Sequence, residues 1–194
     1  MKRPRRVYDI ERPEQMAALA SSVRQEIVDT VHSLGPCSIR EVAHELGRPA
    51  DGLYHHVRQL LRVGLLIDAG ERPAARRPEA LVATPTQGVL RLRYDPSDPD
   101  NAEAIGKIVT SMTRVAERDF RNGFAPELAR CSGPRRNLLA GRQKAWLTGE
   151  QVREVNQLLA RLQEIFTESH SVAEGDLHSL TFVLAPIAPS ERIR

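Results

Sequence analysis

The sequence of 194 residues is 41% hydrophobic and 27% charged with a net charge of +3, which suits one compact domain or two small ones and excludes a disordered or collagen-like polymer. No apolar run approaches the roughly 20 residues of a membrane span, and no apolar stretch after the amino terminus resembles a signal peptide, so we expect a cytoplasmic protein. The two cysteines, Cys37 and Cys131, lie far apart in sequence, which predicts neither a disulfide framework nor a four-cysteine zinc site.

Two helices are predicted near the start of the chain, over residues 13–20 and 22–34. Ser22 and Gln25 have the spacing of a capping box, in which each side chain satisfies a backbone amide at the start of the second helix. The apolar stripe of this helix consists of Ile27, Val28 and Val31. Gly35–Pro36 then ends the helix, because glycine accepts a left-handed cap and proline cannot continue the hydrogen bonding.

A short helix, a tight turn and a longer helix are predicted next. Ser38 and Glu41 form a second capping box. One face of the short helix carries Ile39, Val42, Ala43 and Leu46. Gly47 supplies the turn, and Pro49 suits the first position of a helix that runs to about Val63. The apolar stripe of that longer helix consists of Leu53, Val57, Leu60 and Leu61.

After a closing glycine, two strand-like runs occupy residues 65–67 and 81–84, and the arginine-rich segment 70–78 separates them. The sequence therefore predicts a hairpin with a basic tip. Basic residues are also concentrated in residues 1–6 and 121–144. These three basic segments are candidate sites for polyanions, with ordinary solvated surface charge as the alternative for each of them.

The order of helix, short helix, tight turn, helix and hairpin over residues 22–84 is the plan of a winged helix-turn-helix. Ala43, Gly47 and Leu53 occupy the small, glycine and apolar positions that the motif requires. This plan favours DNA binding over the alternative of a winged helix used only for protein contacts. The sequence has no phosphate-binding glycine loop and no nucleophile motif, so we expect no enzymatic activity.

Four stretches of sequence resemble ArsR-type winged-helix transcriptional regulators, namely residues 19–28 (LASSVRQEIV), 39–46 (IREVAHEL), 53–60 (LYHHVRQL) and 64–66 (GLL). The resemblance implies a homodimeric bacterial repressor or regulator. It also implies that the recognition helix, residues 50–63, enters the major groove and that the wing, residues 65–84, lies along the DNA backbone. A MarR-type or PadR-type regulator is the nearest alternative.

The polar side of the predicted recognition helix supplies the candidates for DNA contact. They are Asp51, Gly52, Tyr54, His55 and Arg58, with Arg48 in the preceding turn. Arg58 suits a two-pronged contact with guanine, whereas Arg48 suits phosphate. On the wing, the candidates for phosphate or minor-groove contact are Arg72, Arg76 and Arg77. Packing at the helix flank is the alternative for Tyr54, and for His56 we favour a role in helix packing over ligand binding.

ArsR-type metal sensors commonly carry cysteines in the first helix of the motif, or aspartate and histidine ligands on a late dimerisation helix. Here the matching stretch, residues 40–46, has no cysteine, and the helix predicted over residues 98–122 has no histidine. We therefore predict no metal site and no cofactor, and the sequence assigns no small-molecule effector.

The fold class predicted for the whole chain is mainly α with small β. Residues 1–94 are expected to form the winged helix-turn-helix domain, and residues 95–194 a dimerisation and possible effector region. The long helix over residues 98–122 carries a narrow apolar stripe. Its own domain is expected to leave this stripe uncovered, so we predict that it packs against the same helix of a second chain.

Beyond the long helix, Thr148 and Gln151 form a third capping box, ahead of a helix whose apolar residues are expected to face inward. Residues 141–147 and 180–184 are expected to pair as two strands. The basic run over residues 130–144 is consistent with an extra DNA-backbone surface or with a pocket for an acidic small molecule.

Overall fold

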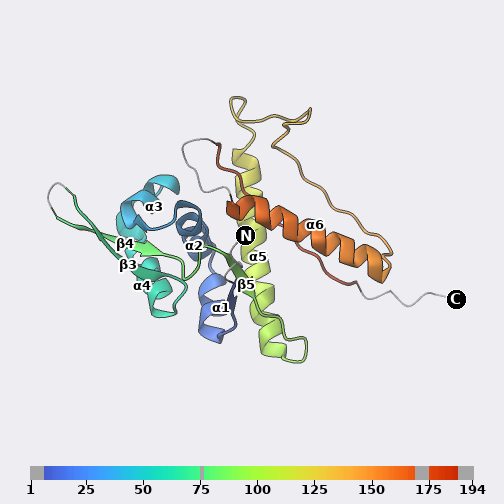
Figure 1. Cartoon of the computed structure of the whole chain (residues 1–194), viewed down its shortest axis with the longest axis horizontal. Helices are drawn as coiled ribbons and strands as arrows, with labels where there is room; N and C mark the ends of the chain where they lie inside the picture. The colour runs from blue at the N-terminus through green and yellow to red at the C-terminus, as the bar shows by residue number, and fades with distance from the viewer. Residues whose placement is uncertain (1–6, 75–76, 169–174, 188–194) are drawn as a thin grey trace, which may run out of the picture.

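A computed structural model describes residues 7–74, 77–168 and 175–187 of the chain (Figure 1), and about half of the chain is helical. The helical elements are α1 (Pro13–Leu19), α2 (Ser22–Leu34), α3 (Ile39–Glu45), the 3-10 turn η1 (Ala50–Gly52), α4 (Tyr54–Arg62), α5 (Pro99–Asn122) and α6 (Gly149–Glu168). The strands are β1 (Val7–Ile10), β2 (Cys37–Ser38), β3 (Ile67–Arg72), β4 (Glu79–Ala83) and β5 (Val89–Leu92). In Figure 1 α3 and α4 lie to the left of the long α5, whereas α6 crosses α5 in this view and extends to the right.

The hydrophobic core is built around α2. Ile27 and Val31 are completely buried on its inner face, because their i,i+4 spacing places them on one side of the helix. Val57 and Leu60 of α4 and Ile108 of α5 belong to the same core cluster. Burial of each large apolar side chain contributes roughly 1.5–3 kcal/mol. The core therefore holds α4 and α5 against α2.

The capping box predicted at Ser22 and Gln25 is wrong. The N-cap of α2 is Ser21, and its side chain makes no capping hydrogen bond. Gln25 is buried instead, and its Nε2 donates to the backbone oxygens of Leu19 at 2.7 Å and Ile108 at 3.1 Å. A buried amide must find partners, and Gln25 finds them on the neighbouring helices. It therefore joins α2 to both α1 and α5.

The capping box at the start of α3 is confirmed. The backbone nitrogen of Ser38 donates to Oε2 of Glu41 at 2.8 Å, and the backbone nitrogen of Glu41 donates to Oγ of Ser38 at 3.3 Å. The turn predicted at Gly47 is also confirmed. Gly47 has a φ of 59°, in the left-handed region that favours glycine.

The helix predicted from Pro49 begins later than expected, at Tyr54. Pro49 is extended, with ψ at 135°, and residues 50–52 form the 3-10 turn that follows it. Gly52 is a poor helix former, and its backbone nitrogen closes the turn by donating to the oxygen of Pro49 at 3.2 Å. Leu53 keeps its predicted place in the core, with 2% of its surface exposed.

The predicted hairpin is confirmed, but its first strand is displaced. Leu65 and Leu66 are buried in the core, and β3 begins only at Ile67. Strand β3 pairs antiparallel with β4, and the short β2 pairs with the other edge of β4, which gives the order β2-β4-β3. A register shift between Asp68 and Glu71 bends the hairpin near Gly70.

Strands β1 and β5 were not expected from the sequence, and they pair in parallel as a separate two-stranded sheet. Ile10, at the end of β1, is buried in the core. The hydroxyl of Tyr8 donates to the backbone oxygen of Gly64 at 3.1 Å. The two strands are also linked by exposed side chains, because Arg91 of β5 donates two hydrogen bonds to the carboxylate of Asp9 of β1. This small sheet attaches both ends of residues 7–92 to the same core.

The long helix begins as predicted, with Asp98 as its N-cap. The Asp98 side chain accepts from the backbone nitrogen of Asp100 at 3.0 Å. The expectation that this helix lacks neighbours in its own domain is wrong in its first half. Ile105 and Ile108 are buried there, where α5 packs against α1 and α2. The remaining apolar residues of its stripe, such as Met112, are only partly buried.

Two predictions for the last third of the chain are wrong. Residues 141–147 and 180–184 have no strand conformation, because each segment lacks a paired strand in the described part of the chain. Helix α6 is present and its capping box is confirmed, with the Thr148 nitrogen 2.9 Å from Oε1 of Gln151. Its apolar stripe does not face inward, however, because no described residue of α6 is buried.

Candidate nucleic-acid interface

Helix α4 presents opposite faces to the core and to solvent. Val57 and Leu60 fix its inner face. On its outer face Tyr54, His55 and Arg58 are exposed, and 43% of the Tyr54 surface is accessible. Within the described residues, Arg58 makes no hydrogen bond or ion pair, so its guanidinium is available to an external acceptor. The structure therefore places these three predicted site residues together.

The two predicted contacts at the start of the recognition helix lie on the 3-10 turn rather than on α4. Asp51 and Gly52 are both exposed there. A Cβ added at Gly52 would meet no heavy atom within 4 Å. The backbone at this turn is therefore open to close approach by a partner such as a sugar-phosphate chain.

Arg48, the predicted phosphate contact in the turn, is held by an acidic side chain. Its Nη2 lies 3.2 Å from Oε2 of Glu26, a residue of α2 with only 5% of its surface exposed. Glu26 also accepts from Arg118 of α5, at 2.5 Å between Oε1 and Nη1. Glu26 thus joins the turn before α4 to the second half of α5.

A second acidic residue of α2, Asp29, lies close to this cluster. Burial among neighbouring side chains and then the negative charges of Glu26 and Asp119 raise the pKa of Asp29 to about 7. The carboxyl lies among these neighbours although Asp29 as a whole residue is exposed on α2. Asp119 is itself paired with Arg118 at 2.7 Å.

The hairpin arginines occupy different environments. Nη2 of Arg72 lies 2.8 Å from Oε2 of Glu79 and 3.0 Å from Oε2 of Glu41, so its charge is largely neutralised. A hydrogen bond from Arg72 lowers the pKa of the Glu79 carboxyl. The pKa of Glu41 is lowered first by the hydrogen bond from the Ser38 backbone and then by that from Arg72. Arg77 is exposed near the tip of the hairpin, whereas Arg76 lies outside the described residues.

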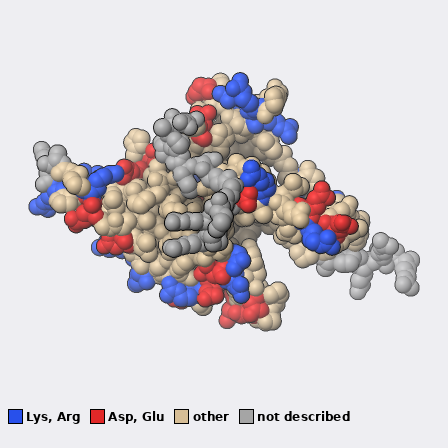
Figure 2. Space-filling view, in the orientation of Figure 1, with Lys and Arg blue, Asp and Glu red and all other residues tan. Residues whose placement is uncertain are grey.

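Figure 2 shows Lys and Arg side chains on the hairpin and along the edge near α4, with acidic side chains between them. The basic segment over residues 1–6 lies outside the described residues. The sequence analysis did not select Arg62, which is exposed on α4 and four residues after Arg58. This i,i+4 spacing places both arginines on one face, and it is the signal that would have found Arg62.

His56 has the packing role that the sequence favoured. The residue is half-buried beside its neighbour His55, at 5.7 Å between ring centroids. Its buried Nδ1 has no hydrogen-bond partner among the described residues. Burial, followed by the positive charge of Arg24, lowers the pKa of His56. Arg24 donates in turn to Oε1 of Gln59 at 2.9 Å and so connects α2 to α4.

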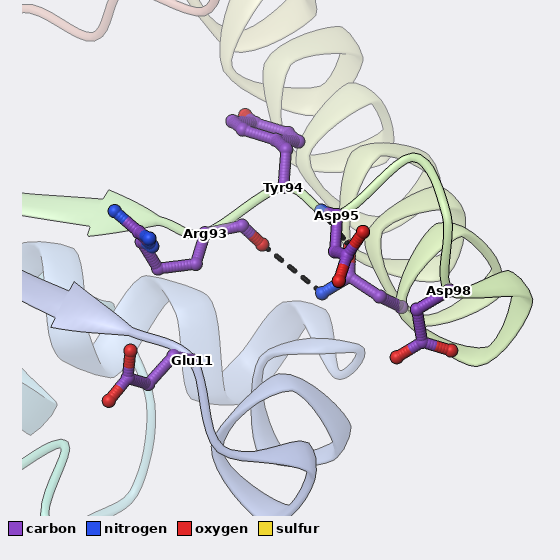
Figure 3. A pocket seen from close by; sticks show the side chains of 6 residues that line it. Glu11, Arg93, Tyr94, Asp95 and Asp98 are labelled. Carbon is purple, nitrogen blue, oxygen red and sulfur yellow. Dashed lines mark hydrogen bonds between the residues drawn. The ribbon is translucent and has the colours of Figure 1, made fainter.

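Two shallow depressions of about 280 and 300 Å³ lie where β1 and α1 approach the start of α5. Figure 3 shows the first of them, with the side chains of Arg93 and Glu11 on one side and those of Asp95 and Asp98 on the other. Acidic residues outnumber basic ones in both linings, and neither lining includes a residue of the basic run over residues 130–144, so neither depression matches the predicted pocket for an acidic small molecule. In the described part of the chain, no three potential ligands are grouped to hold a metal ion.

Residues 19–68, about a quarter of the chain, match a family model described as a helix-turn-helix domain. The match extends from the end of α1 to the start of β3 and includes α3, the Gly47 turn and α4. No curated protein sequence matches the chain. Among the described residues, no helix is long and apolar enough to span a bilayer. The chain therefore contains a helix-turn-helix domain, and such a domain indicates a DNA-binding regulator.

Proposed function

We propose that the protein is a sequence-specific, homodimeric transcriptional regulator of the ArsR type that acts as a repressor. Helix α4, within the predicted recognition helix 50–63, enters the major groove. The hairpin, within the predicted wing 65–84, follows the DNA backbone. A division at about residue 94 separates this DNA-binding part from a dimerisation region, although α5 shares the core of the first part.

The observation that supports this proposal best is the two-faced character of α4. Its inner face is fixed in the core by Leu53 and Val57, while its outer face carries Tyr54, His55 and Arg58. A helix that is anchored on one side can present hydrogen-bonding side chains to base edges in a fixed register. Arg58 is suited to the O6 and N7 acceptors of guanine.

Dimerisation follows from the requirements of this recognition mode. A single helix reads only a few base pairs, whereas two helices about 34 Å apart read both halves of a palindrome. Two copies also double the number of phosphate contacts. We assign no small-molecule effector and no cofactor to this function.

A winged helix that binds only protein is the second candidate, and the paired arginines favour it. Arg48 and Arg72, two of the predicted phosphate contacts, already have carboxylate partners within 3.2 Å. DNA binding would require these arginines to exchange partners or to leave the phosphate contacts to others. Arg58 and Arg77 have no such restriction in the described part of the chain.

A salt titration distinguishes the two candidates. Fragments of the source genome that the purified full chain retains are selected, and binding to them is measured at increasing salt concentration. A DNA-binding regulator should show a logarithm of the binding constant that falls linearly with the logarithm of salt, by about 0.9 per phosphate neutralised. Failure to retain any duplex at low salt would contradict the proposal and favour the protein-binding module.

A further inference from the structure

The segment that follows α5 concentrates positive charge. Residues 124–147 contain five basic residues and one acidic residue, Glu127, so their net charge of +4 exceeds the +3 of the whole chain. The basic residues are all exposed, and they are Arg130, Arg135, Arg136, Arg142 and Lys144. In Figure 1 this segment leaves the upper end of α5, and Figure 2 shows Lys and Arg side chains at this end of the molecule, with acidic side chains beside them.

Three of these arginines lie on a loop that hydrogen bonds hold closed. The backbone nitrogen of Asn137 donates to the oxygen of Arg130 at 2.9 Å, and the backbone nitrogen of Arg130 donates to Oδ1 of Asn137 at 2.8 Å. Within the loop, the backbone nitrogen of Arg136 donates to the oxygen of Gly133 at 3.2 Å. We call residues 130–137 the arginine loop. Its backbone bonds present Arg130, Arg135 and Arg136 on one closed turn of chain.

The arginine loop is fixed against the end of α5. A Cβ added at Gly123, the C-cap of α5, would lie 3.1 Å from Cδ1 of Leu138, so the Leu138 side chain packs directly on this glycine. Nδ2 of Asn137 donates to the backbone oxygen of Leu128 at 3.0 Å, which joins the closed loop to the residues that lead into it. The loop is therefore attached to α5 at both of its ends.

The end of α5 that carries the arginine loop lies beside the turn that precedes α4. Glu26 joins Arg118 of α5 to Arg48 of that turn through its two carboxylate oxygens. Arg118 is four residues before the end of α5 at Asn122, or roughly 6 Å along the helix axis. The arginine loop therefore extends the molecule from the Arg48 side of the predicted DNA interface.

The loop arginines differ from two predicted phosphate contacts because no carboxylate neutralises them. In the described part of the chain, the side chains of Arg130, Arg135 and Arg136 make no hydrogen bond and no ion pair. Arg48 and Arg72, in contrast, are already paired with glutamates. A phosphate can therefore bind the loop arginines without displacing a carboxylate, and charge-assisted bonds from arginine to phosphate are strong.

A polyanion fits this loop better than a small acidic molecule does. A small molecule needs a concave site, and neither of the two depressions described above includes a residue of the arginine loop. Duplex DNA instead offers a row of phosphates to exposed cations, and the release of its counterions favours binding.

We propose that the arginine loop is a second contact with the phosphate backbone of duplex DNA, outside the stretch that α4 and the hairpin reach. This inference rests on the proposed function and extends its footprint along the duplex. Phosphates recur in every sequence, so the loop adds affinity without adding sequence preference.

The test is the salt dependence of DNA binding by the double variant Arg135→Ala, Arg136→Ala. The probe is a duplex that extends one helical turn beyond the selected genomic site on each side. The slope of the logarithm of affinity against the logarithm of salt should fall by about two, and affinity should fall by the same factor on a scrambled duplex. An unchanged slope, or a loss confined to the selected sequence, would overturn the proposal.

The matched control is Lys107→Ala, Arg153→Ala, which removes the same charge from the first half of α5 and from α6. Both side chains are exposed, and neither is a predicted DNA contact. This variant should keep the slope of the natural chain, because the lost charges lie outside the interface. A control that lowers the slope as much as Arg135→Ala, Arg136→Ala would show an effect of net charge alone and would also overturn the proposal.

Chemical modification of the natural chain provides a measurement that needs no variant. Phenylglyoxal modifies accessible arginines, and mass spectrometry of the peptides reports the rate at each site. Excess duplex should slow the modification of Arg135 and Arg136 several-fold and leave Arg153 unchanged. Equal rates with and without duplex would overturn the loop contact.

The outcomes separate this inference from the proposed function. A natural chain that prefers the selected duplex, while the loop variant keeps its slope, refutes the loop contact alone. A natural chain that binds selected and scrambled duplexes equally, with the loop effect intact, refutes sequence-specific regulation alone. A chain that retains no duplex at low salt overturns both.

Discussion

Arg58 is the side chain that best fits direct base readout, because it is exposed on α4 and has no partner within the described residues. We expect Arg58→Ala to weaken binding to the selected genomic site by about 1–3 kcal/mol and to relax the preference at one base pair. Fluorescence anisotropy with the selected duplex and with a scrambled duplex measures both effects. Arg153→Ala, an exposed arginine on α6, is the matched control and should change neither. An equal loss on both duplexes would make Arg58 a phosphate contact.

Glu26 combines a buried carboxylate with two arginine partners, Arg48 and Arg118. We expect Glu26→Gln to lower the free energy of unfolding by about 1–3 kcal/mol, because both arginines lose their ionic partner while keeping some solvent contact. Urea denaturation followed by circular dichroism measures the loss. The comparison is Glu117→Gln, which removes the exposed pair with Arg121 and should cost less than about 1 kcal/mol. Equal losses of stability in the two variants would show that burial of Glu26 does not strengthen its ion pairs.

The raised pKa of Asp29 predicts that the free energy of unfolding depends on pH. Burial and the neighbouring acids raise its pKa in the folded protein from 3.8 to about 7. Between these values the folded protein retains a proton that the unfolded chain has released, so the free energy of unfolding falls as the pH rises through this window. Solvent contact makes the fall smaller than full burial would.

The variant Asp29→Asn isolates this contribution, because asparagine does not titrate. Its melting temperature relative to the natural chain should increase as the pH is raised from the lower end of the window to the upper end. Asp100→Asn, in the first turn of α5, serves as the control for loss of a surface carboxylate. A constant difference between Asp29→Asn and the natural chain across the window would exclude a raised pKa in the folded state.

The two hairpin arginines Arg72 and Arg77, both predicted to contact DNA, have different surroundings in the structure. Arg72 is paired with Glu41 and Glu79, whereas Arg77 is exposed near the tip. If the hairpin follows the DNA backbone, Arg77→Ala should reduce the slope of the logarithm of affinity against the logarithm of salt by about one. Arg72→Ala should change the slope less, because two carboxylates already compete for its charge. An unchanged slope for Arg77→Ala would place the hairpin off the DNA.

The elements that local sequence could predict are those fixed by local hydrogen bonds. The capping boxes at Ser38 and Thr148, the N-cap at Asp98 and the turn at Gly47 depend on residues within a few positions of each other. The same reasoning failed at Gln25, where a long-range bond to Ile108 replaces the local cap. A capping pattern does not indicate whether its side chain will be buried by another helix.

Pairing between distant segments was the second source of error. Strands β1 and β5 are four residues each and are more than seventy positions apart, so neither has a local signal that identifies its partner. The strand pattern of residues 180–184 is clear in the sequence, yet no described strand of the same chain pairs with it. The exposed face of α4 was predictable for a different reason, since helical periodicity alone separates its buried and exposed residues.

The buried residues of the molecule are confined to one part of the chain. Within the described residues, every buried residue lies between Ile10 and Ser111. The last third of the chain contributes exposed apolar side chains instead, including Phe124, which stacks edge to face on Phe120. The molecule therefore has one core, from β1 to α5, and an extension in which no described residue is buried.

This division predicts the course of limited proteolysis with trypsin. The segment between α5 and α6 has exposed cleavage sites at Arg130, Arg135, Arg136, Arg142 and Lys144. We expect the first cuts there, with a fragment containing α1–α5 persisting, because α5 is packed on α1 and α2. Mass spectrometry of the products checks this order, and early cleavage within α2 or the first half of α5 would contradict a single core.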